Sequence, residues 1–403
     1  MPAVNDVLIS GAGVAGPALV HWLHHHGIRA TVVERAPDLR SGGYAIDLRG
    51  VAVDVAERMG ALAEIRRNVT EMDGAAFVDA RGRRSARFSS ADAVDDGRSL
   101  EILRGDLVRI LHAPTTAHTE YLYDDTLTAL EQDGDRVRAT FLNAAPRTFD
   151  LVVGADGLHS ATRRLAFGPE GRYARFLGAY ISIFTIPDHL GLDREARLFN
   201  VPGKAAGMYR TPRAEGAKAV FLLRSPAASG IDRRPPAEQK AYLRAEFAGL
   251  GWENDRILDA MDGTGDFYFD SVTRIHMDTW SAGRVVLLGD AGYCPSPMSG
   301  QGTSLALVGA YVLAGELARH DGAAGALAAY EARMRPYVDA NQAIADAGLG
   351  VLAPRTRRGI LLRDTVLRAG GPLLSLLGRF DRRLSNAAEA LDLDAPAPDP
   401  ARP

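Results

Sequence analysis

The sequence predicts an α/β fold in which a Rossmann-type dinucleotide-binding domain carries an inserted sheet-rich domain and a C-terminal helical segment. Three observations predict it: a glycine-rich turn between an apolar run and an apolar helical face, two later apolar runs that each end in glycine, and a middle block of strand-like segments. The length of 403 residues suits two or three domains.

The composition is that of an ordinary globular protein, with 46% hydrophobic and 24% charged residues. The net charge of -3 argues against a nucleic-acid surface. Cys294 is the only cysteine, which excludes an intrachain disulfide and fits a reducing compartment. We find no signal peptide, no apolar stretch long enough to span a membrane and no metal motif, and we expect a cytoplasmic protein.

The N-terminal segment predicts a β-α-β unit. The apolar run 7–9 leads into Gly11, Gly13 and Gly16, and an apolar helical face then precedes the strand-like run 30–33. In such a unit the first glycine permits a tight turn, the second lets a pyrophosphate approach the backbone, and the third lets helix and strand pack closely. The helix start adds unpaired N–H groups and partial positive charge, so we expect a phosphate site here.

Glu34 ends the second predicted strand, 18 residues after Gly16. A carboxylate at this position accepts hydrogen bonds from ribose hydroxyls and repels a 2′-phosphate. The site therefore suits the adenosine half of FAD or NAD rather than that of NADP.

A second glycine segment late in the chain follows the apolar run 284–288. Asp290 leaves this strand and can bind the ribityl hydroxyls of a flavin, and Gly300 and Gly302 let the backbone approach a flat ring. The helix predicted from Thr303 points its positive end at the loop, which would stabilise the negative charge of a reduced flavin. Together with the first segment, this loop favours FAD.

The middle segment is ambiguous from its residues alone. Asp156 and Gly157 follow the buried run 151–153, and Ser160 and Arg163 come shortly after. Such a turn can contact a pyrophosphate or a nicotinamide cofactor. It can equally be a helix N-cap with an arginine pairing on the next turn.

The rest of the chain divides by its periodicity. Asp-Gly within 132–135 predicts a hairpin, and helices are expected at 237–248, 303–319 and 324–344. In a helical tail at 353–393, we expect the leucines 361–362, 367 and 373–374 to pack on the domain rather than form a membrane face. The predicted parts are an FAD-binding domain at 1–75, 101–174 and 274–345, a substrate domain at 76–100 and 175–273, C-terminal helices at 346–394 and a disordered tail at 395–403.

On these motifs the chain resembles the class A flavoprotein monooxygenases, the group of para-hydroxybenzoate hydroxylase and the tetracycline-inactivating monooxygenases. The resemblance covers about residues 5 to 345, with the glycine loop, the Asp-Gly segment and the late Gly-Asp-Ala segment in the family's order. Relatives often have His where Tyr293 falls and Asn where Ser304 falls, which would alter the edge of the ring. The resemblance adds Arg104 beside the flavin or its pyrophosphate, and a loop from Gly42 to Asp47 near the isoalloxazine. The predicted cofactor-binding residues are Gly11, Gly13, Val14, Ala15, Gly16, Glu34, Arg35, Gly43, Arg104, Asp156, Asp290, Pro297, Gly300, Gly302 and Thr303.

The resemblance implies that NADH or NADPH reduces FAD, which with O2 forms a C4a-hydroperoxyflavin that hydroxylates an aromatic or polyketide-like small molecule. It identifies no acid or base residue. Arg210, Tyr209, Met298 and Phe184 are candidates for the substrate pocket. The sequence leaves open a Baeyer–Villiger or epoxidising relative, a noncatalytic protein that sequesters a flavin or ligand, and a flavin-dependent halogenase, although the halogenase tryptophan motif is missing. It leaves the oligomeric state open too.

Overall fold

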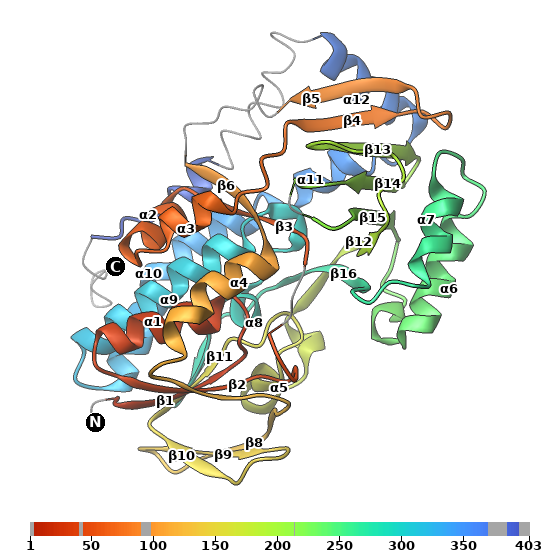
Figure 1. Cartoon of the computed structure of the whole chain (residues 1–403). Coiled ribbons are helices and arrows are strands. Elements are labelled where there is room, and N and C mark those ends of the chain that lie inside the picture. The colour runs from red at the N-terminus through yellow and green to blue at the C-terminus, as the bar shows by residue number, and fades with distance from the viewer. Residues whose placement is uncertain (1–3, 40–42, 90–97, 213, 370–384, 395–403) are drawn as a thin grey trace.

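The computed structural model describes residues 4–39, 43–89, 98–212, 214–369 and 385–394. Two sheets dominate it, one beside the N-terminus and one built from the middle of the chain (Figure 1).

The first sheet has the order β17-β18-β11-β1-β2-β7 and is parallel except for β17. The side chains of the central strand β1 (Asp6–Ser10) alternate between two buried faces. Val7 and Ile9 pack with the helices on one side, and Leu8 packs with a small three-stranded sheet on the other. Burial on both faces explains the continuous apolar runs of the sequence. The strands are β1 (Asp6–Ser10), β2 (Arg29–Val33), β7 (Glu120–Leu122), β11 (Leu151–Gly154), β17 (Ser281–Ala282) and β18 (Val285–Leu287).

Helices cover one face of this sheet and the small sheet covers the other (Figure 1). The helices are α1 (Ala15–His25), α2 (Val51–Arg58), α3 (Leu62–Arg67), α4 (Arg104–His112), α8 (Asp290–Tyr293), α9 (Gly302–Arg319) and α10 (Ala323–Gln342). On the opposite side lie β8 (Leu127–Gln132), β9 (Val137–Phe141), β10 (Arg147–Phe149) and α5 (Ala161–Phe167). The β8–β9 hairpin turns at Gly134, which has a φ of 95° and confirms the hairpin predicted there.

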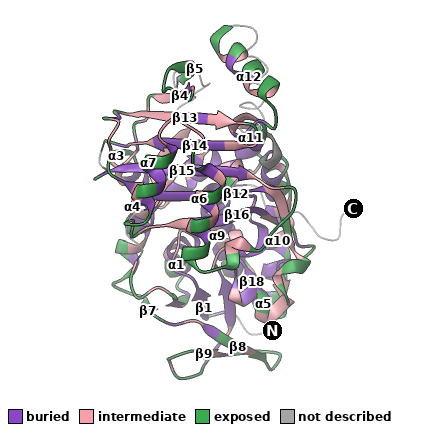
Figure 2. Ribbon diagram, turned by 90° about the vertical axis from the view of Figure 1, so that its right-hand side faces the viewer, coloured by how far each residue is buried: buried purple, intermediate pink, exposed green. Residues whose placement is uncertain are grey.

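The second sheet has seven strands in the order β16-β12-β15-β14-β13-β4-β5, antiparallel except between β13 and β4. Helices α6 (Pro236–Phe247) and α7 (Asn254–Met261) cover one face, and α11 (Ala345–Leu352) packs on the other (Figure 1). Figure 2 shows its central strands largely buried. The strands are β4 (Gly74–Val78), β5 (Arg84–Ser89), β12 (Ala174–Ile186), β13 (Glu195–Val201), β14 (Lys204–Tyr209), β15 (Ala217–Arg224) and β16 (Tyr268–Ile275).

A two-stranded pair, β3 (Ala45–Arg49) with β6 (Ser99–Leu103), lies between the two large sheets. The pairing of β4 and β5 with strands from 174–275 supports the predicted division of the chain, which stays a prediction. The tail predicted to be disordered, 395–403, lies outside the described residues. No described helix is both long and apolar enough to cross a membrane.

The helical tail differs from its prediction. In α12 (Arg357–Ala369), Leu361 and Leu362 are 62% and 66% exposed, whereas Arg363 and Asp364 are buried against the seven-stranded sheet. The expectation that these leucines pack on the domain is therefore wrong. A leucine pattern shows that a helix has an apolar face, but a neighbour that offers polar partners can select the opposite face. Leucines 373–374 lie outside the described residues.

Candidate functional site

The first glycine loop is packed too tightly for side chains at two of its positions. Gly11 has a φ of 110° and donates its N–H to Val33 O at 2.7 Å. A Cβ on Gly11 would lie 2.5 Å from Ala155 O, and one on Gly16 would lie 2.0 Å from Gly11 O. The loop thus turns tightly between β1 and α1, with Val14 and Ala15 at the start of the helix.

Glu34 is fixed beside this loop. One carboxylate oxygen accepts the N–H of Ala12 at 2.8 Å and the other accepts that of Ala36 at 2.9 Å. A carboxylate has about four lone-pair sites, so two remain for the ribose hydroxyls predicted here. Arg35 follows with an exposed side chain.

Arg104 connects the glycine loop to two other segments, the start of α4 and the backbone at Gly43 and Tyr44. It begins α4 directly after β6, and its N–H donates to Tyr44 O at 3.0 Å. A Cβ on Gly13 would lie 3.4 Å from Arg104 Nη2, and one on Gly43 would lie 3.1 Å from Arg104 Cβ. The guanidinium therefore lies next to the backbone where a pyrophosphate is expected. Gly42 lies outside the described residues.

The late segment folds over the start of α9. Asp290 begins α8, and a Cβ on Gly302 would lie 3.4 Å from its Oδ1. Gly300 has a φ of 66°, and a Cβ there would lie 2.9 Å from Asp47 Oδ2. Asp47 of β3 and Asp290 therefore both lie beside this loop. Pro297 is exposed in the short 3-10 helix η5 (Pro297–Ser299), and Thr303 lies in the first turn of α9.

Gln301, between these two glycines, is a residue that the sequence analysis did not select. Its side chain is fully buried, and neither its amide nitrogen nor its amide oxygen has a partner among the described residues. Leaving a buried donor and acceptor unpaired costs ~1–3 kcal/mol each. The loop thus suits a bound group that supplies both, as the pyrimidine edge of a flavin can. A lone amide in a glycine-rich loop was the only signal in the sequence.

We infer an interior cleft between these loops and the seven-stranded sheet from four side chains that lie there. Tyr44, Tyr209, Tyr268 and Asp290 all keep partly accessible surface, yet burial raises the pKa of each of them. Groups that are deep in the protein and still accessible line an internal space. The rings of Tyr44 and Tyr268 lie 5.7 Å apart, and Met298 packs on the same cluster. Met298 therefore lies where a substrate-pocket residue is expected.

The other pocket candidates have different positions. Tyr209 reaches across to β3, where its Oη accepts the N–H of Ala45 at 3.1 Å. Arg210 is partly exposed, and its Nη1 lies 3.8 Å from Asp188 Oδ2. Phe184 is fully buried on the opposite face of the sheet, packed on Phe221 beneath α6 and α7. Its selection as a pocket residue is therefore wrong, because even-numbered positions of β12 face away from the cleft.

The middle segment caps a helix. Asp156 accepts the Thr162 N–H at 2.9 Å and also the Ser160 hydroxyl, while Ser160 Oγ caps α5 by accepting the Arg163 N–H at 2.8 Å. Arg163 is buried and donates to Ala291 O and Glu170. These contacts support the capping interpretation. Asp156 lies beside Gly11, and its contact with a cofactor stays a prediction.

The two departures from the family pattern lie in packed surroundings. Tyr293 is buried, with its Oη 2.8 Å from Tyr330 Oη, and it packs in the core rather than at the edge of the cleft. Ser304 Oγ accepts the N–H of Arg49 at 3.2 Å and so ties β3 to α9. Burial raises the pKa of the Cys294 thiol well above its usual value, which argues against a reactive thiolate.

Comparison with known proteins decides the nature of this site. The sequence profile of a family described as FAD binding domain matches residues 5–345. The chain belongs to this FAD-binding family. The match includes all three glycine-centred segments, which supports the prediction that the loops brought together by the fold hold the flavin.

Among curated relatives, the flavin-dependent monooxygenase of Legionella longbeachae is 41% identical over 342 residues, covering 83% of this chain and 86% of that protein. The uncharacterized protein Rv1260 of Mycobacterium tuberculosis is 46% identical over 343 residues, covering 84% and 92%. The crystal structure of tetracycline destructase Tet(55) superposes with a TM-score of 0.84 at 38% identity, covering 98% of this chain and 100% of that one.

The protein is therefore an FAD-dependent monooxygenase. Its described residues fit the cofactor: the glycine loop leaves backbone exposed beside Arg104, Glu34 is fixed for the ribose, and Gln301 is buried without partners beside Asp290. Bound FAD supplies the chemistry of activating O2 and transferring one oxygen atom.

Proposed function

We propose that this monooxygenase takes electrons from NADH or NADPH and hydroxylates a planar, electron-rich polyketide-like aromatic molecule. The molecule would lie in the cleft between the flavin loops and the seven-stranded sheet. The observation that carries the proposal is the mixed lining of this cleft, where aromatic and apolar side chains surround a few polar groups. Cofactor-enzyme pockets commonly have this composition.

The apolar part of the lining suits flat rings. Tyr44, Tyr268 and Met298 contact a cluster that includes Ile181 and Leu222 of the sheet. Aromatic rings stack favourably on such walls, and the walls exclude water from the reacting atoms. The relatives support the same class, because Tet(55), and Tet(51) at 34% identity and a TM-score of 0.85, are both tetracycline destructases.

A polar row on the same face would orient the substrate. Tyr209 and Lys218 are directly paired across β14 and β15. Lys218, Val220 and Leu222 are every second residue of β15, so the side chain of Lys218 lies on the same face as the other two, which face the cleft. The ammonium of Lys218 donates to Asp266 Oδ2 at 2.8 Å and to Thr185 Oγ1 at 2.6 Å. We propose that its third N–H binds a phenolate or enolate oxygen, which would increase the electron density of the ring to be hydroxylated.

The test begins with the visible spectrum of the purified protein. NADH and NADPH oxidation in air is then followed with a panel of polyphenols, hydroxylated anthraquinones and tetracycline, and products are analysed by mass spectrometry. We expect bound FAD, substrate-stimulated oxidation of one nicotinamide and a product heavier by one oxygen atom. Bound FAD with no stimulation by any planar aromatic compound in the panel would contradict the proposed substrate class.

A further inference from the structure

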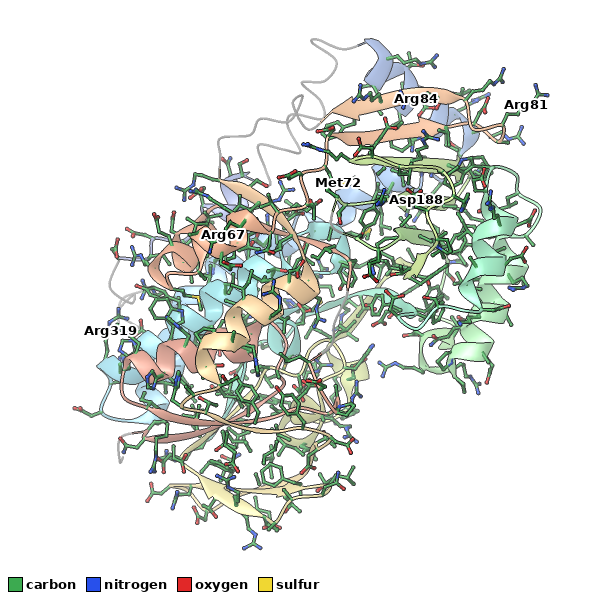
Figure 3. The ribbon with its side chains drawn as sticks, in the orientation of Figure 1. Arg67, Met72, Arg81, Arg84, Asp188 and Arg319 are labelled. Carbon is green, nitrogen blue, oxygen red and sulfur yellow. The ribbon has the colours of Figure 1, made fainter. Side chains whose placement is uncertain are left out.

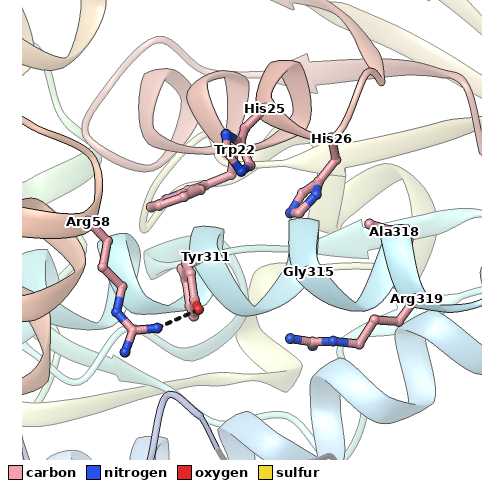
Figure 4. A pocket seen from close by; sticks show the side chains of 8 residues that line it. All are labelled: Trp22, His25, His26, Arg58, Tyr311, Gly315, Ala318 and Arg319. Carbon is pink, nitrogen blue, oxygen red and sulfur yellow. Dashed lines mark hydrogen bonds between the residues drawn. The ribbon is translucent and has the colours of Figure 1, made fainter.

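A second cavity, of about 300 Å³ and open to solvent, lies at the surface between the C-terminal halves of α1 and α9 (Figure 4). Arg58 of α2 closes one end of it and Arg319 of α9 borders the other. The lining residues are Trp22, His25, His26, Arg58, Tyr311, Gly315, Ala318 and Arg319.

Two aromatic rings form the inner wall of this cavity. Trp22 and Tyr311 meet edge to face, with ring centroids 4.9 Å apart and planes at 77°. Trp22 is only 6% exposed, and its Nε1–H has no acceptor among the described residues. The indole therefore presents its ring carbons, rather than its N–H, to the cavity. Gly315 and Ala318 leave room opposite the rings because their side chains are absent or small.

The polar groups at the cavity are mostly hydrogen-bond donors. Arg58 donates to Tyr311 Oη at 2.8 Å, so this oxygen already accepts a hydrogen bond. Arg58 also pairs with Asp394 at 2.9 Å. Arg319 Nη1 donates to Glu316 Oε1 at 2.7 Å, but Glu316 is shared with Arg333 at 3.1 Å. Arg319 therefore shares its carboxylate with a second guanidinium, that of Arg333.

His26 lies close to other positively charged groups. Burial lowers the pKa of His26, and the nearby charges of His25 and Arg319 lower it further. An anion beside Arg58 and Arg319 in the cavity would reduce this repulsion, so the electrostatics favour a negatively charged ligand.

We propose that this cavity is a second binding site, specific for a planar aromatic carboxylate of one or two rings. The rings would lie against Trp22 and Tyr311, and the carboxylate would accept hydrogen bonds from Arg319 and the neighbouring donors. A charge-assisted contact of this kind is about twice as strong as a neutral one. A volume of about 300 Å³ is at the lower end of the range for small-molecule sites.

This site is separate from the flavin cleft. Arg319 lies 17 residues beyond Gly302 on the same helix, which corresponds to about 25 Å along its axis. Figure 3 places Arg319 at the outer edge of the nucleotide-binding part, far from Asp188 on the side of the seven-stranded sheet. A ligand in this cavity would therefore contact α1 and α9 without reaching the flavin loops at which both helices begin.

The proposal is tested on the FAD-loaded protein by calorimetric titration with 2-naphthoate, and with 2-naphthamide as its uncharged analogue. We expect 2-naphthoate to bind and the amide to bind at least fivefold more weakly. Arg319→Gln should weaken 2-naphthoate binding at least fivefold, and Ala318→Trp, which fills the cavity, should abolish binding at this site. Arg256→Gln, an exposed arginine on α7, is the control with the same charge change.

Flavin absorbance and circular dichroism first establish that the variants are folded, and the titrations then support or overturn the second site. Weaker binding in both cavity variants and unchanged binding in Arg256→Gln supports the second site. Identical titrations of wild type, Arg319→Gln and Ala318→Trp would place the probe elsewhere and overturn the proposal. Absence of binding to the wild-type protein at millimolar 2-naphthoate overturns it as well.

Discussion

At the residue scale, the flavin site depends on places where a single methyl group does not fit. The Cβ that any other residue would add at Gly16 overlaps the carbonyl oxygen of Gly11, because the helix crosses the turn at this point. The clash is with backbone, which cannot rotate aside as a long side chain does. Cofactor binding is therefore sensitive to very small changes in this turn.

We predict that Gly16→Ala loses FAD. The added Cβ would lie 2.0 Å from Gly11 O, so the loop must open and its N–H groups leave the phosphate position. FAD affinity, measured by titration of the apoprotein, should fall at least tenfold, or about 1.4 kcal/mol. Gly171→Ala is the control, because nothing lies within 4 Å of its added Cβ. Equal FAD affinity in the two variants would refute the steric argument.

Lys218→Met tests the polar row of the cleft. The substitution keeps the length of the side chain but removes the cation proposed to bind a substrate oxygen. We expect KM for the substrate to rise about tenfold, as for the loss of a charge-assisted hydrogen bond, with FAD content unchanged. Lys240→Met, on α6 behind the opposite face of the sheet, should leave KM unchanged. A lowered kcat with unchanged KM would contradict a role in substrate binding.

At the element scale, α12 shows how tertiary partners override an apolar pattern. Arg363 donates to Asn200 Oδ1 at 2.7 Å and pairs with Asp364 at 2.8 Å, and its guanidinium lies 3.6 Å from the ring centroid of Phe77. Asp364 in turn accepts the hydroxyl of Ser85 at 2.7 Å. The helix is attached through a charged pair because β5 and β13 offer polar partners there and β4 offers an aromatic ring.

We predict that Arg363→Met detaches α12. Removing one member of a buried ion pair leaves Asp364 without its charge partner, which typically costs ~3–5 kcal/mol. Hydrogen exchange of the amides in α12 and β5 should become faster, while that of β1 and β11 stays slow. Arg358→Met, an exposed arginine on the same helix, is the control. Equal protection of α12 in both variants would show that the pair does not hold the helix.

The elements that could be predicted from the sequence are those fixed by local pattern. The β-α-β unit, the β8–β9 hairpin and α9 follow from apolar periods and turn residues, and the structure confirms them. Period-two alternation correctly separates the faces of β12, but it does not say which face meets the cofactor, and so Phe184 was assigned wrongly. The unpaired amide of Gln301 becomes visible only when the surrounding loops are in place.

At the scale of the whole molecule, His159 joins the two large parts of the protein. It follows β11 of the first sheet, and its Nε2 lies 3.1 Å from Asp270 of β16 in the second sheet. Its Nδ1 lies 3.2 Å from Glu170, which is also bound by Arg163. An imidazolium between two carboxylates thus connects the flavin-binding part to the sheet that forms the other wall of the cleft.

This contact predicts a pH-dependent stability. Burial lowers the pKa of His159, but hydrogen bonds to Asp270 and Glu170 outweigh burial and raise the pKa to about 9. A raised pKa contributes stability that is complete below the unfolded value of about 6.5 and is lost as the pH rises through about 9. Between pH 6 and 9.5 the wild type should lose about 1 kcal/mol more than His159→Gln, allowing for partial exposure.

Urea unfolding at the two pH values measures this difference. His276→Gln, at an exposed histidine, should show the same pH dependence as the wild type. If His159→Gln also keeps the wild-type dependence, the imidazolium does not link the two parts.

The order of strands in the first sheet has a consequence for synthesis in the cell. Val7 pairs with Leu151, and Val152 pairs in turn with Val285, so the sheet is completed only after most of the chain has left the ribosome. Contacts so distant in sequence form slowly, and the strands that wait for them expose unpaired edges. The nascent chain therefore displays its phosphate-binding turn long before α9 exists to complete the flavin site. FAD can therefore make its full set of contacts only late in synthesis, once α9 has emerged from the ribosome.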